Sequence, residues 1–280
     1  MKRKTTPQFI KDRLVRLGIP LMFFTLFVFL PFNYIGDQSG KNIVEVFIDT
    51  YFNKPPIATG HLWFVASLLV YSIIYILSFK QDSNSSKTIS FKQYYIFIYI
   101  IGLTIIATLV RLFYPIDTWR TWIIPVEVAH IPQYFSLFLI GTLFNRYQWL
   151  DAFKLKTGIY FFIIALLSYF SNDYLPENIR DYWLTEAFIE SLLCVGISMS
   201  ILTIFRIYAN KTNHFIQLLS DNAFGIYLFH VLVVIGLQAA MLNLTINANL
   251  KFVLVTILGI IISLGISWLL RKNKLIRTVI

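Results

Sequence analysis

Long runs of apolar residues, separated by short polar and charged segments, make up most of this 280-residue chain. A helix needs about 20 mostly apolar residues to cross a bilayer, and eight runs reach or approach that length. A soluble helical protein would carry a polar face at the helical period, which these runs lack. The pattern therefore predicts an all-α polytopic transmembrane helix bundle that forms one membrane domain over residues 1–280. The predicted spans are Leu17–Ile35, His61–Phe79, Tyr94–Phe113, Ile131–Phe144, Thr157–Ser171, Glu186–Tyr208, Ser220–Leu242 and Leu250–Leu270.

Lys and Arg residues gather on alternate sides of these spans. Eighteen of the 24 lie in the two tails and the even-numbered loops, whereas the opposite loops hold only five and Arg111 lies inside a span. Because positively charged loops stay in the cytoplasm, both termini are predicted to be cytoplasmic. The eighteen are Lys2, Arg3, Lys4, Lys11, Arg13, Arg16, Lys80, Lys87, Lys92, Arg146, Lys154, Lys156, Arg206, Lys211, Arg271, Lys272, Lys274 and Arg277.

The net charge of +10 is therefore mostly a signal of topology. Membrane lipid is the first expected partner, and anionic lipid or a phosphorylated ligand would suit the cytoplasmic side. Nothing beyond the charge itself supports binding to nucleic acid. The single cysteine, Cys194, excludes an internal disulfide and a cysteine metal cluster. No histidine spacing is typical of a metal site, so we expect no metal.

Ionisable side chains inside the predicted spans are the main chemical signal, because such groups are costly in hydrocarbon and usually face the bundle interior. Arg111 lies near the outer end of the third span, and His230 lies midway along the seventh. His61 and His130 begin the second and fourth spans, with Glu127 one helical turn before His130. The pattern predicts an external or mid-membrane cavity lined by these five residues.

Each of these residues also has a structural explanation. His230 could simply hydrogen-bond a neighbouring helix. Arg111 could form an ion pair with a glutamate of the sixth span, where Glu186, Glu190, Cys194 and Ser198 recur every four residues as a polar stripe. His61 and His130 could be ordinary solvated residues at the membrane interface. A histidine whose pKa lies near neutrality is well suited to deprotonate a hydroxyl group. The spacing does not identify which histidine would do so.

Four motifs, in order along nearly the whole chain, resemble the acyltransferase-3 family of integral membrane proteins. The first resembles the basic R-x-x-R entry to a family helix, and the second resembles the "HLWFL" helix start. The third and fourth resemble the "P-x-Y-x-x-x-F-x-x-G" helix and the late "S-x-x-S-F-G-I-Y-L-x-H" motif. In this chain they read FIKDRLVRLGIPL (Phe9–Leu21), HLWFVASLL (His61–Leu69), IPQYFSLFLIG (Ile131–Gly141) and SDNAFGIYLFH (Ser220–His230).

The resemblance implies a membrane-bound O-acyltransferase that moves an acyl group, commonly acetyl, from cytoplasmic acyl-CoA to a glycan or other cell-envelope acceptor. Such a protein belongs in a bacterial or archaeal cell membrane. Arg13 and Arg16 are three residues apart, so on a helix they share one face. Two guanidinium groups there suit the phosphates of acyl-CoA. The catalytic candidates are His230, Arg111, His61, Glu127 and His130.

The chain departs from the family pattern at its start. Family members usually have ten spans, and the first carries an arginine and a histidine regarded as central to transfer. This chain begins where the third family helix would begin, and none of its four histidines maps onto that residue. We expect a truncated sequence. The alternatives are that another subunit completes the chain or that it lacks transferase activity and serves as an assembly partner.

A transporter or flippase for a glycan or lipid-linked precursor is the competing functional class. Such proteins often show internal repeats and helices that are broken near the membrane midplane. Here all nine prolines precede Glu177, and the last three predicted spans contain none. The proline pattern therefore favours the acyltransferase interpretation.

Overall fold

The computed structural model describes residues 6–31, 34, 40–53, 59–78, 90–121, 125–180, 182–208, 211 and 213–280. The chain divides into two compact units, which we describe separately. Unit 1 comprises Met1–Phe79 together with Thr212–Ile280, and unit 2 comprises Lys80–Lys211. The predicted span ends at Ile35 and Phe79 lie outside the described residues. The expectation of one membrane domain over residues 1–280 stays a prediction.

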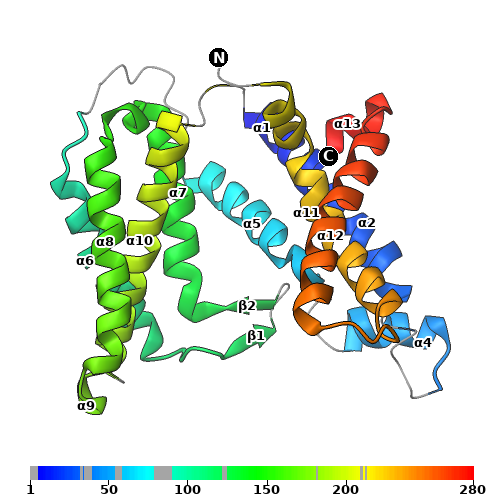
Figure 1. Ribbon diagram of the computed structural model, residues 1–280, viewed down its shortest axis with the longest axis horizontal. Coiled ribbons are helices and arrows are strands. Elements are labelled where there is room, and N and C mark those ends of the chain that lie inside the picture. The colour runs from blue at the N-terminus through cyan, green and yellow to red at the C-terminus, as the bar shows by residue number, and fades with distance from the viewer. Residues whose placement is uncertain are drawn as a thin grey trace. The chain divides into compact units, whose positions relative to one another are not determined.

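Unit 1 is helical in its described parts (Figure 1). The segments η1, η2 and η3 are π-helical and η4 is a 3-10 turn. Its elements are α1 (Thr6–Arg13), η1 (Leu14–Gly18), α2 (Ile19–Phe23), η2 (Phe24–Phe29), α4 (Ile43–Ile48), η3 (Asp49–Asn53), η4 (Gly60–Leu62), α5 (Trp63–Ser78), α11 (His214–Ala240), α12 (Ala248–Leu270) and α13 (Lys274–Val279).

Unit 2 is also mainly helical, with one short pair of strands that the sequence pattern did not predict. Here η5, η6 and η7 are 3-10 turns. Its elements are α6 (Tyr94–Arg111), β1 (Trp119–Thr121), β2 (Pro125–Glu127), η5 (Val128–His130), α7 (Ile131–Tyr147), η6 (Trp149–Ala152), α8 (Leu155–Ser171), η7 (Asn172–Tyr174), α9 (Glu177–Arg180) and α10 (Trp183–Tyr208).

Six helices among the described residues are long and apolar enough to cross a membrane, which confirms the all-α polytopic class. Each corresponds to a predicted span. The fourth predicted span corresponds to a shorter apolar helix, Val128–Phe144. The first overlaps the consecutive helical segments η1, α2 and η2. The six are Gly60–Ser78, Tyr94–Arg111, Leu155–Tyr174, Trp183–Tyr208, His214–Ala240 and Ala248–Leu270.

The N-terminal helical segments change hydrogen-bond pattern near a proline. Pro20 has no N–H group, so it cannot donate to the carbonyl of Arg16. The π-helical turn η1 lies immediately before α2, where Pro20 occupies the first turn. Wider turns of this kind accommodate a missing bond in a helix without ending it. The stretch therefore continues as one helical path up to Phe29.

Unit 1 is held by an apolar core beneath these segments. Leu17 and Phe24 pack with Leu62, Leu228 and Ile280, and all five are almost fully buried. The first of these residues belongs to η1, and the others come from η2, η4, α11 and the end of the chain. The core therefore joins the N-terminal helix to segments more than 200 residues later.

Small residues let α8 and α10 approach closely in unit 2, as Figure 1 shows for these two neighbouring helices. A Cβ atom at Gly196 would lie only 2.7 Å from the carbonyl oxygen of Phe161 and from the Cβ of Ala165. The hydroxyl of Ser200 donates to the carbonyl of Gly158 at 2.6 Å. Close contact through small residues and interhelical hydrogen bonds is typical of helix pairs in membranes.

The strands β1 and β2 form an antiparallel pair in the register Trp119 to Glu127. Each strand has three residues, which is too short for an alternating pattern to stand out in the sequence. The pair ends directly before η5, so it sets the position of Glu127 relative to His130. The strand pair therefore places Glu127 directly before η5, the turn that carries His130.

Candidate functional site

Two histidines that are far apart in the sequence lie together in unit 1. The ring centroids of His61 and His230 are 5.2 Å apart, with the planes nearly perpendicular. The 3-10 turn η4 supplies the first ring, and α11 supplies the second about midway along its length. The hydroxyl of Tyr227 donates to the carbonyl of His61 at 2.6 Å, which ties η4 to α11.

Backbone carbonyls orient both imidazole rings. Nδ1 of His230 lies 2.6 Å from the carbonyl oxygen of Tyr227, and Nε2 of His61 lies 3.2 Å from that of Leu228. A carbonyl only accepts, so each of these nitrogens is assigned as the one that carries the proton. The opposite nitrogens, Nε2 of His230 and Nδ1 of His61, then hold the basic lone pairs. The two backbone hydrogen bonds therefore fix the orientation of each ring and, where the ring is neutral, its tautomer.

Aromatic rings and a glycine fix the place of His61. Phe24 and Phe29 contact its ring edge to face, with centroids 6.4 and 5.8 Å away. The preceding Gly60 has φ +49°, a conformation that side-chain-bearing residues rarely adopt. A Cβ atom there would lie 2.9 Å from the Phe29 ring. Glycine is therefore needed at this position for the chain to turn into η4.

The two predicted donor-binding arginines occupy the same N-terminal helical path. Arg13 ends α1, and its guanidinium lies over the Phe9 ring, 4.8 Å from the centroid. Burial lowers the pKa of Arg13, the like charge of Arg16 lowers it further, and Asp12 partly opposes the shift. Arg16 lies in the π-helical segment η1, so α-helical spacing ends at Arg13. The two arginines are nevertheless only three residues apart on one continuous helical path.

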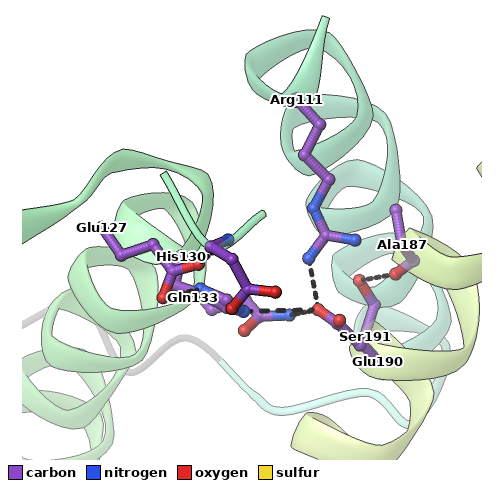
Figure 2. Close-up of polar contacts among 8 residues, drawn as sticks. Arg111, Glu127, His130, Gln133, Ala187, Glu190 and Ser191 are labelled. Carbon is purple, nitrogen blue, oxygen red and sulfur yellow. Dashed lines mark hydrogen bonds and ion pairs between the residues drawn. The ribbon is translucent and has the colours of Figure 1, made fainter. Parts of the chain in front are cut away.

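A second group of polar side chains lies in unit 2 (Figure 2). Arg111, at the end of α6, forms an ion pair with the carboxylate of Glu190 on α10. The same carboxylate oxygen accepts from Nε2 of Gln133 at 3.3 Å and lies 3.8 Å from Nε2 of His130. The Arg111 side chain is only 3% exposed, whereas that of Glu190 is 33% exposed. The group therefore opens toward its surroundings at the carboxylate.

His130 has a carboxylate at its other ring nitrogen as well. Its Nδ1 lies 3.0 Å from Oε2 of Glu127, although the two groups are not aligned as a hydrogen bond. The other oxygen of Glu127 accepts from the backbone N–H of Asp117 at 2.7 Å. Tyr134 stacks on the His130 ring from one turn further along. Glu127 and Tyr134 thus hold this ring in place.

The guanidinium of Arg111 retains unused donors. Among the described residues, its Nε and Nη1 have no hydrogen-bond partner, and the hydroxyl of Thr108, one turn earlier, has none either. A buried donor without a partner costs about 1–3 kcal/mol, and more when it is charged. The unit 2 group therefore combines buried donors on Arg111 with a partly exposed acceptor on Glu190.

The structure thus distributes the predicted site residues between the two units. His61, His230 and the arginines at 13 and 16 belong to unit 1, while Arg111, Glu127 and His130 belong to unit 2. One cavity that holds all the catalytic candidates stays a prediction. Their roles also stay predictions, because position alone does not assign chemistry.

Sequence reasoning did not single out several residues that complete these groups. Gln133 lies within a quoted motif, and its amide in an otherwise apolar helix was the available signal. Tyr134 and Phe24 resemble ordinary core aromatics, and only the fold brings them against a histidine. Glu190 was noted as part of a polar stripe, and the structure shows that it is the partner of Arg111.

The apolar helices, with ionisable side chains held inside helical units, define a polytopic membrane protein with chemically competent polar groups. The model of the acyltransferase-3 family, described as an acyltransferase domain, matches residues 1–272. The chain belongs to this family, which confirms the resemblance and identifies an integral membrane acyltransferase as the class. No curated protein and no solved structure matches the chain.

Proposed function

We propose that this protein is an O-acyltransferase of a bacterial or archaeal cell membrane. It transfers an acyl group, acetyl in the simplest case, from cytoplasmic acyl-CoA to a hydroxyl group of a glycan or another cell-envelope acceptor. Family membership supports the reaction class. The observation that carries the finer proposal is the His61–His230 pair, in which a backbone carbonyl orients each imidazole ring.

Unit 1 also carries the arginines that we assign to the donor. The helical path from Arg16 to Phe24 spans eight residues, or roughly 12 Å at about 1.5 Å per residue. Phe24 in turn contacts the ring of His61. An acyl-CoA whose phosphates lie at the arginines would extend its acyl arm along this path toward the histidines. The same compact unit would then hold both ends of the donor.

In the reaction that we propose, His230 acts as the base in place of the family histidine, onto which none of the four histidines of this chain maps. Nε2 of His230 takes the proton of the acceptor hydroxyl while that oxygen attacks the thioester carbonyl carbon. The new carbon–oxygen bond forms and the carbon–sulfur bond breaks, and CoA leaves as a thiolate that recovers the proton from the imidazolium. Nδ1 keeps its bond to the Tyr227 carbonyl throughout, which holds the ring in the required tautomer. His61 lies beside this ring and limits its movement.

Transfer of radiolabelled acetyl groups from acetyl-CoA to the glycan fraction of membranes that contain the protein tests this assignment. General base catalysis contributes about 10²–10⁴-fold, so His230→Gln is expected to lower kcat by at least about 100-fold. His214→Gln is the matched control, because this histidine begins the same helix and is exposed. Equal loss in both variants, or full activity of His230→Gln, would contradict the role of His230. No transfer by the unmodified protein, combined with passage of a glycan precursor across the membrane, would favour the transporter alternative.

A further inference from the structure

The C-terminal helix α13 brings a second set of basic residues beside the N-terminal arginines. α13 packs against η1, the segment that contains Arg16. Ile276 and Val279 pack against the unit 1 core, which also contains Leu17 and Ile280. Two segments that lie at opposite ends of the sequence therefore form one surface within unit 1.

Hydrogen bonds within the C-terminal segment hold α13 in this surface. Nη1 of Arg271 donates to the backbone carbonyl of Ile280 at 2.5 Å, which closes the C-terminal turn. The side-chain amide oxygen of Asn273 accepts from the N–H of Leu275 and caps the start of α13. These bonds and the packed isoleucines hold the short helix in a defined orientation.

Four basic residues lie in or next to α13, and two of them, Arg271 and Lys272, already contact other groups of the protein. Arg271 holds the carbonyl of Ile280, and the ammonium group of Lys272 lies 3.9 Å from the centroid of the Trp268 ring. Lys274 and Arg277 are exposed, and among the described residues neither side chain has a hydrogen-bond or ion-pair partner. Lys274 and Arg277 are three residues apart, so they lie on the same side of α13. Arg277 directly follows the packed Ile276, so this side differs from the apolar face that packs against the core.

We propose that Lys274 and Arg277 bind the 3′-phosphate of the CoA moiety, beside the diphosphate held by Arg13 and Arg16. This inference rests on the proposed acyl-CoA donor and names residues that complete its site. CoA carries three phosphate groups, and two guanidinium groups match only the two of the diphosphate. The remaining phosphate needs further cations, and α13 presents them next to η1. Lysine acts as a point charge for phosphate, and arginine adds a bidentate contact.

Charge on the surface supports a ligand with several phosphates. The α13 sequence KLIRTV contains no acidic residue. Asp12 is the acidic residue near the arginines, and the pKa of Arg13 is lowered in spite of it. Burial is the main cause of that lowered pKa and the like charge of Arg16 is the second, so a polyanion that neutralises both cations is favoured. A general attraction to anionic lipid is the rival explanation, because cytoplasmic basic residues are also attracted to lipid headgroups.

Binding of CoA and of 3′-dephospho-CoA to the purified full chain in detergent separates these explanations. The unmodified protein is expected to bind CoA more tightly than 3′-dephospho-CoA. Lys274→Gln with Arg277→Gln should raise the Kd for CoA about tenfold and leave the Kd for 3′-dephospho-CoA within about twofold. Lys154→Gln with Lys156→Gln is the matched control, because it removes two exposed cations from unit 2, on the same predicted side of the membrane. It should change neither Kd.

The remaining outcomes each have one meaning. Arg13→Gln with Arg16→Gln should weaken both ligands, because both contain the diphosphate. If that variant weakens binding while the α13 variant does not, the donor site stands and the role of α13 is overturned. A lack of CoA binding by the unmodified protein overturns both. The thermal stability of the protein is also compared in phosphatidylglycerol and in phosphatidylcholine vesicles. If the α13 variant changes only the difference between these two stabilities and neither Kd, the surface binds lipid and the inference is wrong.

Discussion

At the scale of single residues, the contact between Arg111 and Glu190 shows how a polar group persists inside an apolar unit. The guanidinium is almost fully buried, and Glu190 supplies the compensating charge. Two donors of the guanidinium group, Nε and Nη1 of Arg111, still lack partners among the described residues. Removing one partner of a buried ion pair costs about 3–5 kcal/mol, because an uncompensated charge remains, whereas apolar replacement of both is often tolerated.

This asymmetry predicts how variants of the pair behave. Glu190→Gln is expected to destabilise the protein by about 3 kcal/mol, at the low end of that range because Glu190 is one third exposed. Arg111→Met with Glu190→Gln should recover much of the loss. Thermal unfolding in detergent, followed by circular dichroism, measures the double variant and the two single variants, Glu190→Gln and Arg111→Met. A double variant whose loss equals the sum of the two single losses would show that the charges do not interact.

At the scale of secondary-structure elements, the helices were far easier to predict than the faces that they bury. The sequence pattern predicted a polar stripe through Glu186 and Glu190 along the sixth span, yet Glu186 is exposed. The buried line on α10 instead includes Ala187, Ser191 and Gly196. Lipid and protein interiors are both apolar, so hydropathy does not distinguish a packed face from a lipid face.

Capping explains another boundary that hydropathy misplaced. The seventh span was predicted to begin at Ser220, whereas α11 begins at His214. The side chain of Asn213 accepts from the N–H of Ile216 at 2.7 Å and provides the N-cap. Between this cap and Ser220, only His214 and Gln217 interrupt the apolar pattern. Helix ends therefore depend on local hydrogen bonds that a hydropathy window averages away.

The close contact between α8 and α10 yields a prediction with an internal control. Gly196→Ala places a Cβ atom 2.7 Å from backbone and side-chain atoms of α8, so the helices must move apart. Overpacking of this kind is expected to cost about 1–3 kcal/mol. Gly236→Ala in α11 meets no atom within 4 Å and should be neutral or slightly stabilising. Detergent melting curves compare the two, and equal effects would contradict close packing at Gly196.

At the scale of the whole molecule, the order of the four motifs was sufficient to identify the family, but not the neighbours of each histidine. His61 and His230 are 169 positions apart, and their contact depends on the N-terminal helix and the turn at Gly60. His130 instead meets Glu127 three residues earlier, a local contact that the spacing in the sequence already indicated. Local motifs indicate the chemistry, whereas long-range packing decides which groups meet.

The orientation of the whole chain in the membrane is the last prediction. Because eighteen basic residues lie on one side and five on the other, the C-terminal tail is expected inside and the η7 region outside. We would place single cysteines at Tyr174 and Leu275, which are 89% and 79% exposed, in a Cys194→Ala background that removes the single native thiol. On intact cells, an impermeant maleimide should label position 174 and should reach position 275 only after permeabilisation. The cysteine-free protein should remain unlabelled in both conditions. Labelling of position 275 but not position 174 on intact cells would reverse the topology, and the basic surface at α13 would then face away from cytoplasmic acyl-CoA.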